Sequence, residues 1–182
     1  TGATGTGKTT ALDILSGHIP EDERIIVIED TAELRLTQPH VVRLQARVPN
    51  TQGVGAVTLR QLFRNSLRMR PDRILIGEVR GEEAVDMVQA IASGHHGCMG
   101  VLHASSPSNA IRRLEVMMLQ GGLQLPLWAI HRQIAETIEL IVQHEQMVDG
   151  SRRITHLTAV QGVDEDGVRL EDLFTFVPEG DT

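Results

Sequence analysis

The 182-residue sequence has little cysteine and few aromatic residues. Cys98 is the only cysteine, which excludes an internal disulfide and a cysteine zinc site within these residues. The aromatic residues are Phe63, Trp128, Phe174 and Phe176, and tyrosine is absent. Single-strand nucleic-acid binders stack bases on aromatic rings, so that function is disfavoured. A reducing, cytoplasmic setting is the simplest expectation.

Long apolar runs are also missing. No stretch approaches the ~18 residues that a membrane span needs. The first residues are glycine-rich instead of basic and then apolar, so we expect no signal peptide. The net charge of −7 opposes broad nucleic-acid binding. The length fits one domain with a small extension.

Lysine is as scarce as cysteine, because Lys8 is the only lysine among 17 basic residues. A GC-rich genome would favour arginine over lysine, and we take that as the cause of the bias. Lys8 then stands out as an exception. A compact ammonium suits a tight loop in a way that a guanidinium does not.

Apolar β-rich runs alternate with helical patterns over the first 137 residues, which predicts an α/β core with a mostly parallel sheet. The expected strands are 25–28, 41–44, 74–76 and 99–102. The expected helices are 9–15, 58–69 with Thr58 as N-cap, one that starts at Glu82–Glu83 and ends at Gly94, one that starts at Pro107 after the N-cap Ser106, and one from Pro126.

Three β-rich runs follow, at 138–148, 153–163 and 168–177. The pairs Asp149–Gly150 and Asp166–Gly167 separate them, and Asp-Gly is a strong hairpin signal. We therefore expect a C-terminal antiparallel β meander. The predicted division is a core at 1–137 and a β-rich extension of the same domain at 138–182.

The opening stretch TGATGTGKTT contains the full pattern G-x-x-x-x-G-K-[ST]. Glycines let backbone N–H groups turn inward around phosphates, lysine reaches the β- and γ-phosphates, and the following hydroxyl ligates Mg²⁺. The alternative is a flexible glycine-rich terminus. We predict that the loop binds ATP through Gly2, Ala3, Thr4, Gly5, Thr6, Gly7, Lys8, Thr9 and Thr10.

The strand 74–76 leads to Gly77 and Glu78, at the sheet edge where α/β folds place ligands. Most phosphate-loop ATPases have an Asp where Gly77 stands, so the metal needs another carboxylate. We predict that Glu78 orients or deprotonates the attacking water. A solvated residue at a strand end is the alternative.

Three acids follow the strand 25–28, namely Glu29, Asp30 and Glu33. Acids at one strand end repel each other unless a cation neutralises them. We predict that they hold Mg²⁺ with Thr9. A surface acidic turn is the alternative interpretation.

His103 ends another expected strand, where it is positioned to donate to the γ-phosphate and to report its loss. A lone histidine at a strand end is more often structural. Six arginines also cluster in 21 residues: Arg60, Arg64, Arg68, Arg70, Arg73 and Arg80. Most fit ordinary surface or salt-bridge roles.

Four motifs in this order resemble the type II/type IV secretion ATPases, closest to the tight-adherence (Flp) pilus assembly ATPases and next to the conjugal-transfer ATPases. The motifs are TGATGTGKTT, IEDTAEL, LRMRPDRILIGEVRG and GHHGCMGVLHASSP. The resemblance implies a RecA-like phosphate-loop NTPase core. It also implies an aspartate box at Glu29, Asp30 and Glu33, catalytic roles for Glu78 and Glu33, and a histidine box with His95 and His103.

The resemblance further implies a Mg²⁺- and ATP-dependent homo-hexamer in the cytoplasm. In such a ring one arginine of the cluster, with Arg80 and Arg70 favoured, would act on a neighbouring subunit's nucleotide. It would act peripherally at the inner membrane, through platform proteins of a secretion or pilus system. Two departures stand out. His96 replaces the usual acidic residue, and the tetracysteine zinc element of some type II members is absent.

The resemblance thus predicts an ATP-hydrolysing motor that couples hydrolysis to movements in the ring, and three other functions compete with it. A nucleic-acid-stimulated ATPase would need a basic groove, which the acidic balance disfavours. A nucleotide-gated assembly module would bind ATP without turnover. A phosphotransferase is less favoured, because no acceptor-binding lid is evident.

The family places a strand and an N-terminal domain before the loop, so we expect this chain to be a fragment. We then expect Thr1 to Gly7 to be poorly held, and a central slot of the sheet to be empty or refilled. The fragment alone should hydrolyse ATP weakly or not at all. Side-by-side turnover assays of the fragment and the full-length enzyme check this, and comparable rates would refute it.

Overall fold

The computed structural model describes residues 1–177, which divide into two compact units. One unit is Thr9–Val101. The other combines Thr1–Lys8 with the chain from Leu102 onward. Each unit has its own sheet, and the two are described in turn.

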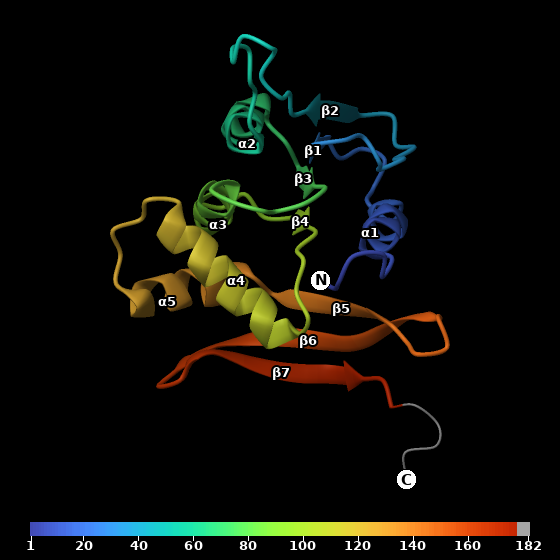
Figure 1. The fold of residues 1–182 in the computed structure, drawn as a ribbon, viewed down its shortest axis with the longest axis vertical. Coiled ribbons are helices and arrows are strands. Elements are labelled where there is room, and N and C mark those ends of the chain that lie inside the picture. The colour runs from blue at the N-terminus through green and yellow to red at the C-terminus, as the bar shows by residue number, and fades with distance from the viewer. Residues whose placement is uncertain (178–182) are drawn as a thin grey trace. The chain divides into compact units, whose positions relative to one another are not determined.

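Thr9–Val101 is built on a four-stranded parallel sheet in the order β2-β1-β3-β4 (Figure 1). The strands are β1 (Ile25–Glu29), β2 (Val41–Gln45), β3 (Arg73–Ile76) and β4 (Cys98–Gly100). Its helices are α1 (Lys8–Ser16, whose first residue belongs to the other unit), α2 (Leu59–Ser66), the 3₁₀ turn η1 (Leu67–Met69) and α3 (Glu83–Ala92). Helix α1 lies on one side of the sheet, and α2 and α3 lie on the other.

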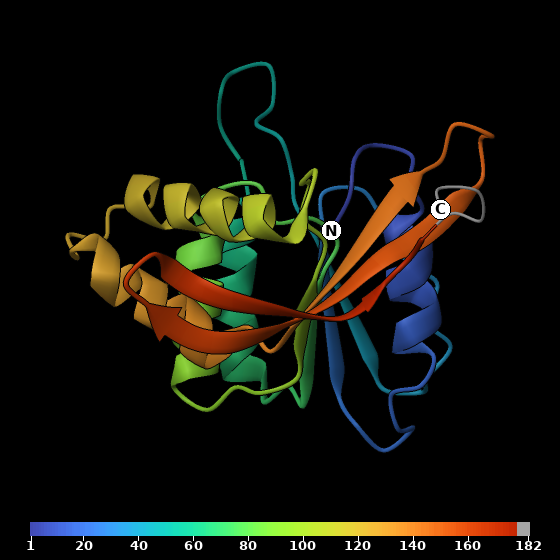
Figure 2. The ribbon, with the colours of Figure 1, turned by 90° about the horizontal axis from the view of Figure 1, so that it is seen from below.

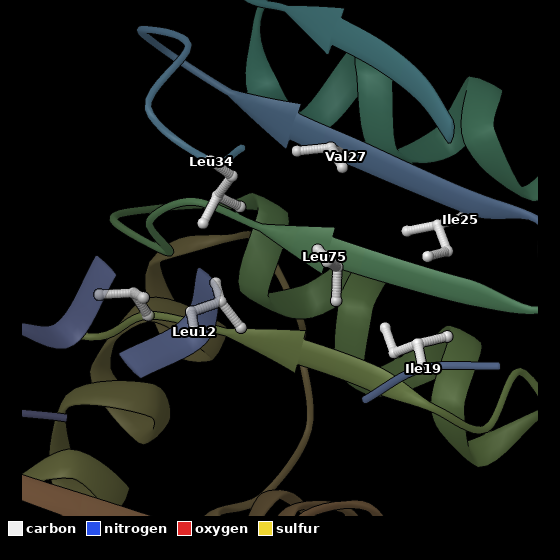
Figure 3. Close-up of a cluster of buried hydrophobic side chains, with 7 residues drawn as sticks. Leu12, Ile19, Ile25, Val27, Leu34 and Leu75 are labelled. Carbon is white, nitrogen blue, oxygen red and sulfur yellow. The ribbon is translucent and has the colours of Figure 1, made fainter. Parts of the chain in front are cut away.

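Apolar residues form the core of this unit, because β1 is buried along its whole length. On the α1 side, Leu12 packs with Ile25, Val27 and Leu75 of the strands and with Leu34 (Figure 3). Strands buried on both faces read as continuous apolar runs. This explains why the runs at 25–28 and 74–76 predicted the strands correctly.

The predicted start of α2 is confirmed. The Thr58 hydroxyl accepts from the Gln61 backbone N–H, and the Gln61 side chain accepts from the Thr58 N–H, which makes a capping box. Two ends differ from expectation. The α-helix stops at Ser66 and continues to Met69 as a 3₁₀ turn, and β4 covers only Cys98–Gly100 instead of 99–102.

The other unit contains the antiparallel meander β5-β6-β7, whose long strands twist strongly (Figure 2). Its elements are α4 (Pro107–Gln120), α5 (Leu127–Thr137), β5 (Leu140–Gln146), β6 (Arg152–Asp164) and β7 (Gly167–Thr175). Helix α5 packs on β6 and β7, and α4 packs on α5 and β5. The predicted meander and its two turns are confirmed.

Within residues 1–177, no helix combines the length and the hydropathy needed to cross a membrane. The change from helices to antiparallel strands near residue 137 falls inside the second unit. The domain division drawn there from the sequence stays a prediction.

Candidate functional site

The glycine-rich loop closes on itself. The Thr6 hydroxyl donates to the Ala3 carbonyl oxygen at 2.9 Å, and the Lys8 ammonium donates to the same oxygen at 2.5 Å. Thr6 and Lys8 are only 3% and 8% exposed. Gly5 takes a φ of 78°, a left-handed value that favours glycine. The loop is therefore a compact turn with the Lys8 side-chain ammonium bound at its rim.

The first two residues of the loop are firmly held. The Thr1 nitrogen donates to the Val142 carbonyl oxygen at 2.5 Å, and the His144 N–H donates to the Thr1 carbonyl oxygen at 2.9 Å. Gly2 forms parallel bridges to both His103 and His144. The expectation that Thr1 and Gly2 would be poorly held is therefore wrong, because backbone pairing on two sides fixes them.

Gly2 lies where no other residue fits. Its φ is 149°, and an added Cβ would lie 2.6 Å from the Thr6 hydroxyl and 3.2 Å from the His144 Cβ. Contacts under 3.0 Å force a neighbour to move, and here the neighbours are a buried hydroxyl and a paired strand. The first glycine of the motif is thus required by close packing as well as by its conformation.

His103 lies beside the lysine. Its Nδ1 is 3.5 Å from the Lys8 Nζ. An ammonium only donates, so the ring nitrogen is the acceptor in this contact. The sequence predicted that His103 would belong to the phosphate site, and the structure brings it to Lys8. Its role as a γ-phosphate sensor stays a prediction.

Glu29, at the end of β1, has a task that its sequence pattern did not reveal. It is 4% exposed, and its Oε1 accepts from the Glu33 and Leu34 N–H groups at 2.9 and 3.0 Å. A Cβ on Gly77 would lie 2.9 Å from the Glu29 Cγ. The space that the usual Asp would occupy at position 77 is already filled by Glu29, which explains the glycine.

Glu78 and Asp30 meet at one guanidinium in the same unit. The Arg80 Nη2 lies 2.5 Å from the Glu78 Oε2, and its Nη1 lies 3.3 Å from the Asp30 Oδ2. The hydrogen bond with Glu78 raises the pKa of Arg80. Glu83 fixes the backbone of the turn that carries Arg80, because its Oε1 accepts from the Arg80 N–H at 2.6 Å. Two acids from separate strand ends are therefore neutralised by a side chain of this chain.

The predicted magnesium ligands do not form an all-protein cage. Among residues 1–177, no group of three or more His, Cys, Asp or Glu side chains is arranged to hold a metal. Magnesium at phosphate loops keeps waters and phosphate oxygens and takes few protein ligands. Thr9, the second residue of α1, supplies a hydroxyl of the type required. The Thr9 hydroxyl therefore fits a nucleotide-bound Mg²⁺, and the roles of Glu29, Asp30 and Glu33 as ligands stay predictions.

The other arginines of the cluster mostly make local ion pairs. Arg60 and Arg64 pair with Asp86 at 2.6 and 2.8 Å and so tie α2 to α3. Arg73 pairs with Glu23. Arg70 is exposed and takes a left-handed φ of 52°, rare for a non-glycine residue.

The first part of the histidine box, with His95 and His96, lies in the short connection from α3 to β4. His95 is half-buried and His96 is exposed. A Cβ on Gly97 would lie 2.6 Å from the Arg73 guanidinium, so that side chain lies directly against the loop. The Cys98 thiol donates to the His95 carbonyl oxygen at 3.5 Å. Arg73 and Cys98 therefore both contact this connection.

Sequence reasoning missed two residues of β5 next to the loop. Gln143 is fully buried and His144 is 8% exposed. Burial lowers the pKa of His144, and the positive charge of Lys8 lowers it further. The signal was a polar pair inside an otherwise apolar strand start, Leu-Ile-Val-Gln-His.

Comparison with known proteins finds relatives of this chain in one family. The family model for type II/IV secretion system proteins matches residues 1–163. A putative conjugal transfer protein of Mycobacterium tuberculosis is 43% identical over 160 residues, covering 88% of this chain and 45% of its own length. The type IV secretion system protein VirB11 of Brucella suis is 39% identical over 164 residues, covering 87% and 45%. This chain thus spans about half the length of these relatives.

Solved structures give the same result. The VirB11 ATPase of the Brucella suis type IV secretion system, in complex with sulphate, superposes with a TM-score of 0.77 at 39% identity, covering 86% of this chain and 46% of the other. The pilus retraction motor PilT with bound ADP has a TM-score of 0.63 at 21% identity, covering 97% and 46%, which speaks for the fold alone. The predicted fold class and family resemblance are confirmed.

Cys98 offers a direct test of the packing under the histidine box. Burial raises the pKa of its thiol to about 11, against the opposing effect of Arg73. At pH 8 the thiolate should then be about 100-fold rarer than in an unfolded chain, and alkylation correspondingly slower. Because the folded pKa is the higher one, ionisation should favour unfolding only as the pH rises from 9 towards 11.

Mass spectrometry of iodoacetamide labelling measures the effect, with the protein in guanidinium as the control. Cys98 is the only thiol in the sequence, so the labelling reports on it alone. Equal labelling rates in the native and unfolded samples would show that the thiol is not desolvated.

Proposed function

The chain belongs to the type II/IV secretion system protein family, and from that premise we propose that it is the ATP-hydrolysing part of a secretion or pilus motor. The observation that carries the proposal is the phosphate loop with Lys8 bound at its rim and His103 beside it. A relative at 39% identity is described as the ATPase of a type IV secretion system.

The loop would bind the phosphates of ATP. Its backbone N–H groups and the start of α1 supply positive ends of dipoles, and Lys8 supplies a full charge. Lys8 already donates to the Ala3 carbonyl oxygen and is nearly buried, so little side-chain freedom remains to be lost on binding. Thr9 would hold the Mg²⁺ that accompanies ATP, with Glu29, Asp30 and Glu33 as the predicted carboxylates nearby.

Glu78 would orient the attacking water and accept its proton. The Arg80 guanidinium donates to the Glu78 Oε2 at 2.5 Å, which would hold the carboxylate in place at the end of β3. Glu33 is exposed and lies in the turn that Glu29 caps. It is the second candidate for this chemistry. His103, in contact with Lys8, would sense whether the γ-phosphate is present.

Motor action would follow from assembly. We propose a homo-hexameric ring in the cytoplasm, held at the inner membrane by platform proteins of the secretion or pilus system. In that ring Arg80 would reach a neighbour's nucleotide. Residues 1–137 would form the ATPase core and 138–182 its β-rich extension.

Lys8→Ala should weaken ATP binding of the intact protein by about 100-fold, because charge-assisted hydrogen bonds to the phosphates are lost. Lys8→Arg should fail as well, since the larger planar guanidinium does not fit where the ammonium is nearly buried. Equilibrium titration with a fluorescent ATP analogue measures both. Arg132→Ala, an exposed site on α5, is the control. Wild-type affinity in Lys8→Ala would refute the assignment of the loop.

Glu78→Gln should leave ATP binding within a few-fold of wild type and lower kcat by about 10²–10⁴-fold, because the amide accepts no proton. Steady-state phosphate release and the same titration separate the two effects. Glu136→Gln, which removes a carboxylate from the exposed ion pair on α5, is the matched control. Normal turnover in Glu78→Gln would move the water-positioning role to Glu33.

A further inference from the structure

Gln143 is a polar side chain in the middle of β5 with no exposed surface. Both ends of its amide are bonded. The Oε1 accepts from the Thr1 hydroxyl at 2.5 Å, and the Nε2 donates to the Ala104 carbonyl oxygen at 3.3 Å. The amide therefore bridges two segments that lie far apart in the sequence.

Those two segments belong to the nucleotide site. Thr1 directly precedes the first glycine of the phosphate loop, and Ala104 directly follows His103. Burying an amide is costly unless its donor and acceptor are both satisfied. A leucine would fill such a position in a strand without this requirement. The hydrogen bonds therefore suggest a purpose beyond packing.

Backbone groups of β5 also bind the start of the phosphate loop. Val142 and His144 bond the nitrogen and the carbonyl of Thr1, while Gly2 bridges His103 and His144. Backbone pairing fixes where the loop begins. The Gln143 amide is the side-chain link that reaches past the loop to the residue after His103.

We propose that Gln143 is a positioning residue that couples the phosphate loop to His103, so that the two move together when nucleotide enters. The idea rests on the proposed function, because it assigns ATP to this loop. With the amide present, a shift of Thr1 is passed to Ala104 through two hydrogen bonds. Without it, only the backbone bridge between Gly2 and His103 links the two, and the distance of 3.5 Å between Lys8 and His103 is less tightly fixed.

The first test needs no nucleotide. Hydrogen exchange in the intact protein should speed up in the peptides covering 1–8 and 102–106 for Gln143→Leu, by about tenfold, and should stay unchanged in α2 and α3. Gln146→Leu makes the same substitution at an exposed position of the same strand and should change neither peptide. Unchanged exchange in both peptides of Gln143→Leu would overturn the coupling.

The second test uses ATP and ADP. Gln143→Leu should weaken ATP binding by about tenfold more than ADP binding, because only ATP carries the γ-phosphate that His103 would contact. A residue with a merely structural role would lower the unfolding temperature and weaken both nucleotides equally, and that result also overturns the proposal.

Thr1→Val keeps the test open if Gln143→Leu folds poorly, since it removes only the hydroxyl donor and preserves the shape. The double variant should be no worse than Gln143→Leu alone, because both changes break one link. Additive losses would show that the residues act separately. Wild-type protein that binds ATP without turnover would contradict the proposed motor, while the affinity ratio and the exchange data would still decide the role of Gln143.

Discussion

The backbone pairing of Gly2 with His103 on one side and His144 on the other is the constraint on which the phosphate-loop unit depends. A phosphate loop works only if its N–H groups and its lysine are held in place before the ligand arrives, since ordering them later would reduce affinity. Pairing on two sides supplies that order. The same pairing brings His103 to Lys8, because a residue bridged to Gly2 lies next to the loop that Lys8 closes. It also explains the demand for glycine, as any Cβ would meet the Thr6 hydroxyl.

A second steric constraint shapes the other unit. Strands β1 and β3 are neighbours in register, and Gly77 donates its N–H to the Ile28 carbonyl oxygen at 2.9 Å. The narrow space beyond that bond holds one carboxylate, which comes from Glu29 instead of residue 77. Glu29 uses one of its oxygens to cap two N–H groups of the turn that carries Glu33. The same side chain, Glu29, thus caps the turn and leaves no room for an acidic side chain at position 77.

The sequence predicted well what depends on local pattern. Apolar runs predicted β1 and β3, the pair Ser106–Pro107 predicted the start of α4, and the loop motif was complete within ten residues. It failed where partners are distant. Nothing near Gln143 in the sequence indicates that its amide meets Thr1 and Ala104, because those contacts exist only once β5 lies beside the loop. The firm hold on Thr1 was missed for the same reason. Strand β4 ends at Gly100, although the next residue, Val101, still donates its N–H to the Ile76 carbonyl oxygen.

Arg80 shows why a paired side chain is not thereby excluded from a second role. It bridges Glu78 and Asp30, yet it is 57% exposed on its side chain. Ion pairs at such exposed positions contribute about 0–1 kcal/mol, since water competes and long side chains lose freedom. An arginine acting on a transferred phosphoryl group contributes about 10³–10⁵ in rate, or roughly 4–7 kcal/mol. The stabilisation of the transition state would therefore be several times larger than the free energy lost when Arg80 leaves its ion pair. The local pair would therefore hold Arg80 ready without opposing its proposed transfer to a neighbour's nucleotide, and that transfer would free Glu78 for the attacking water.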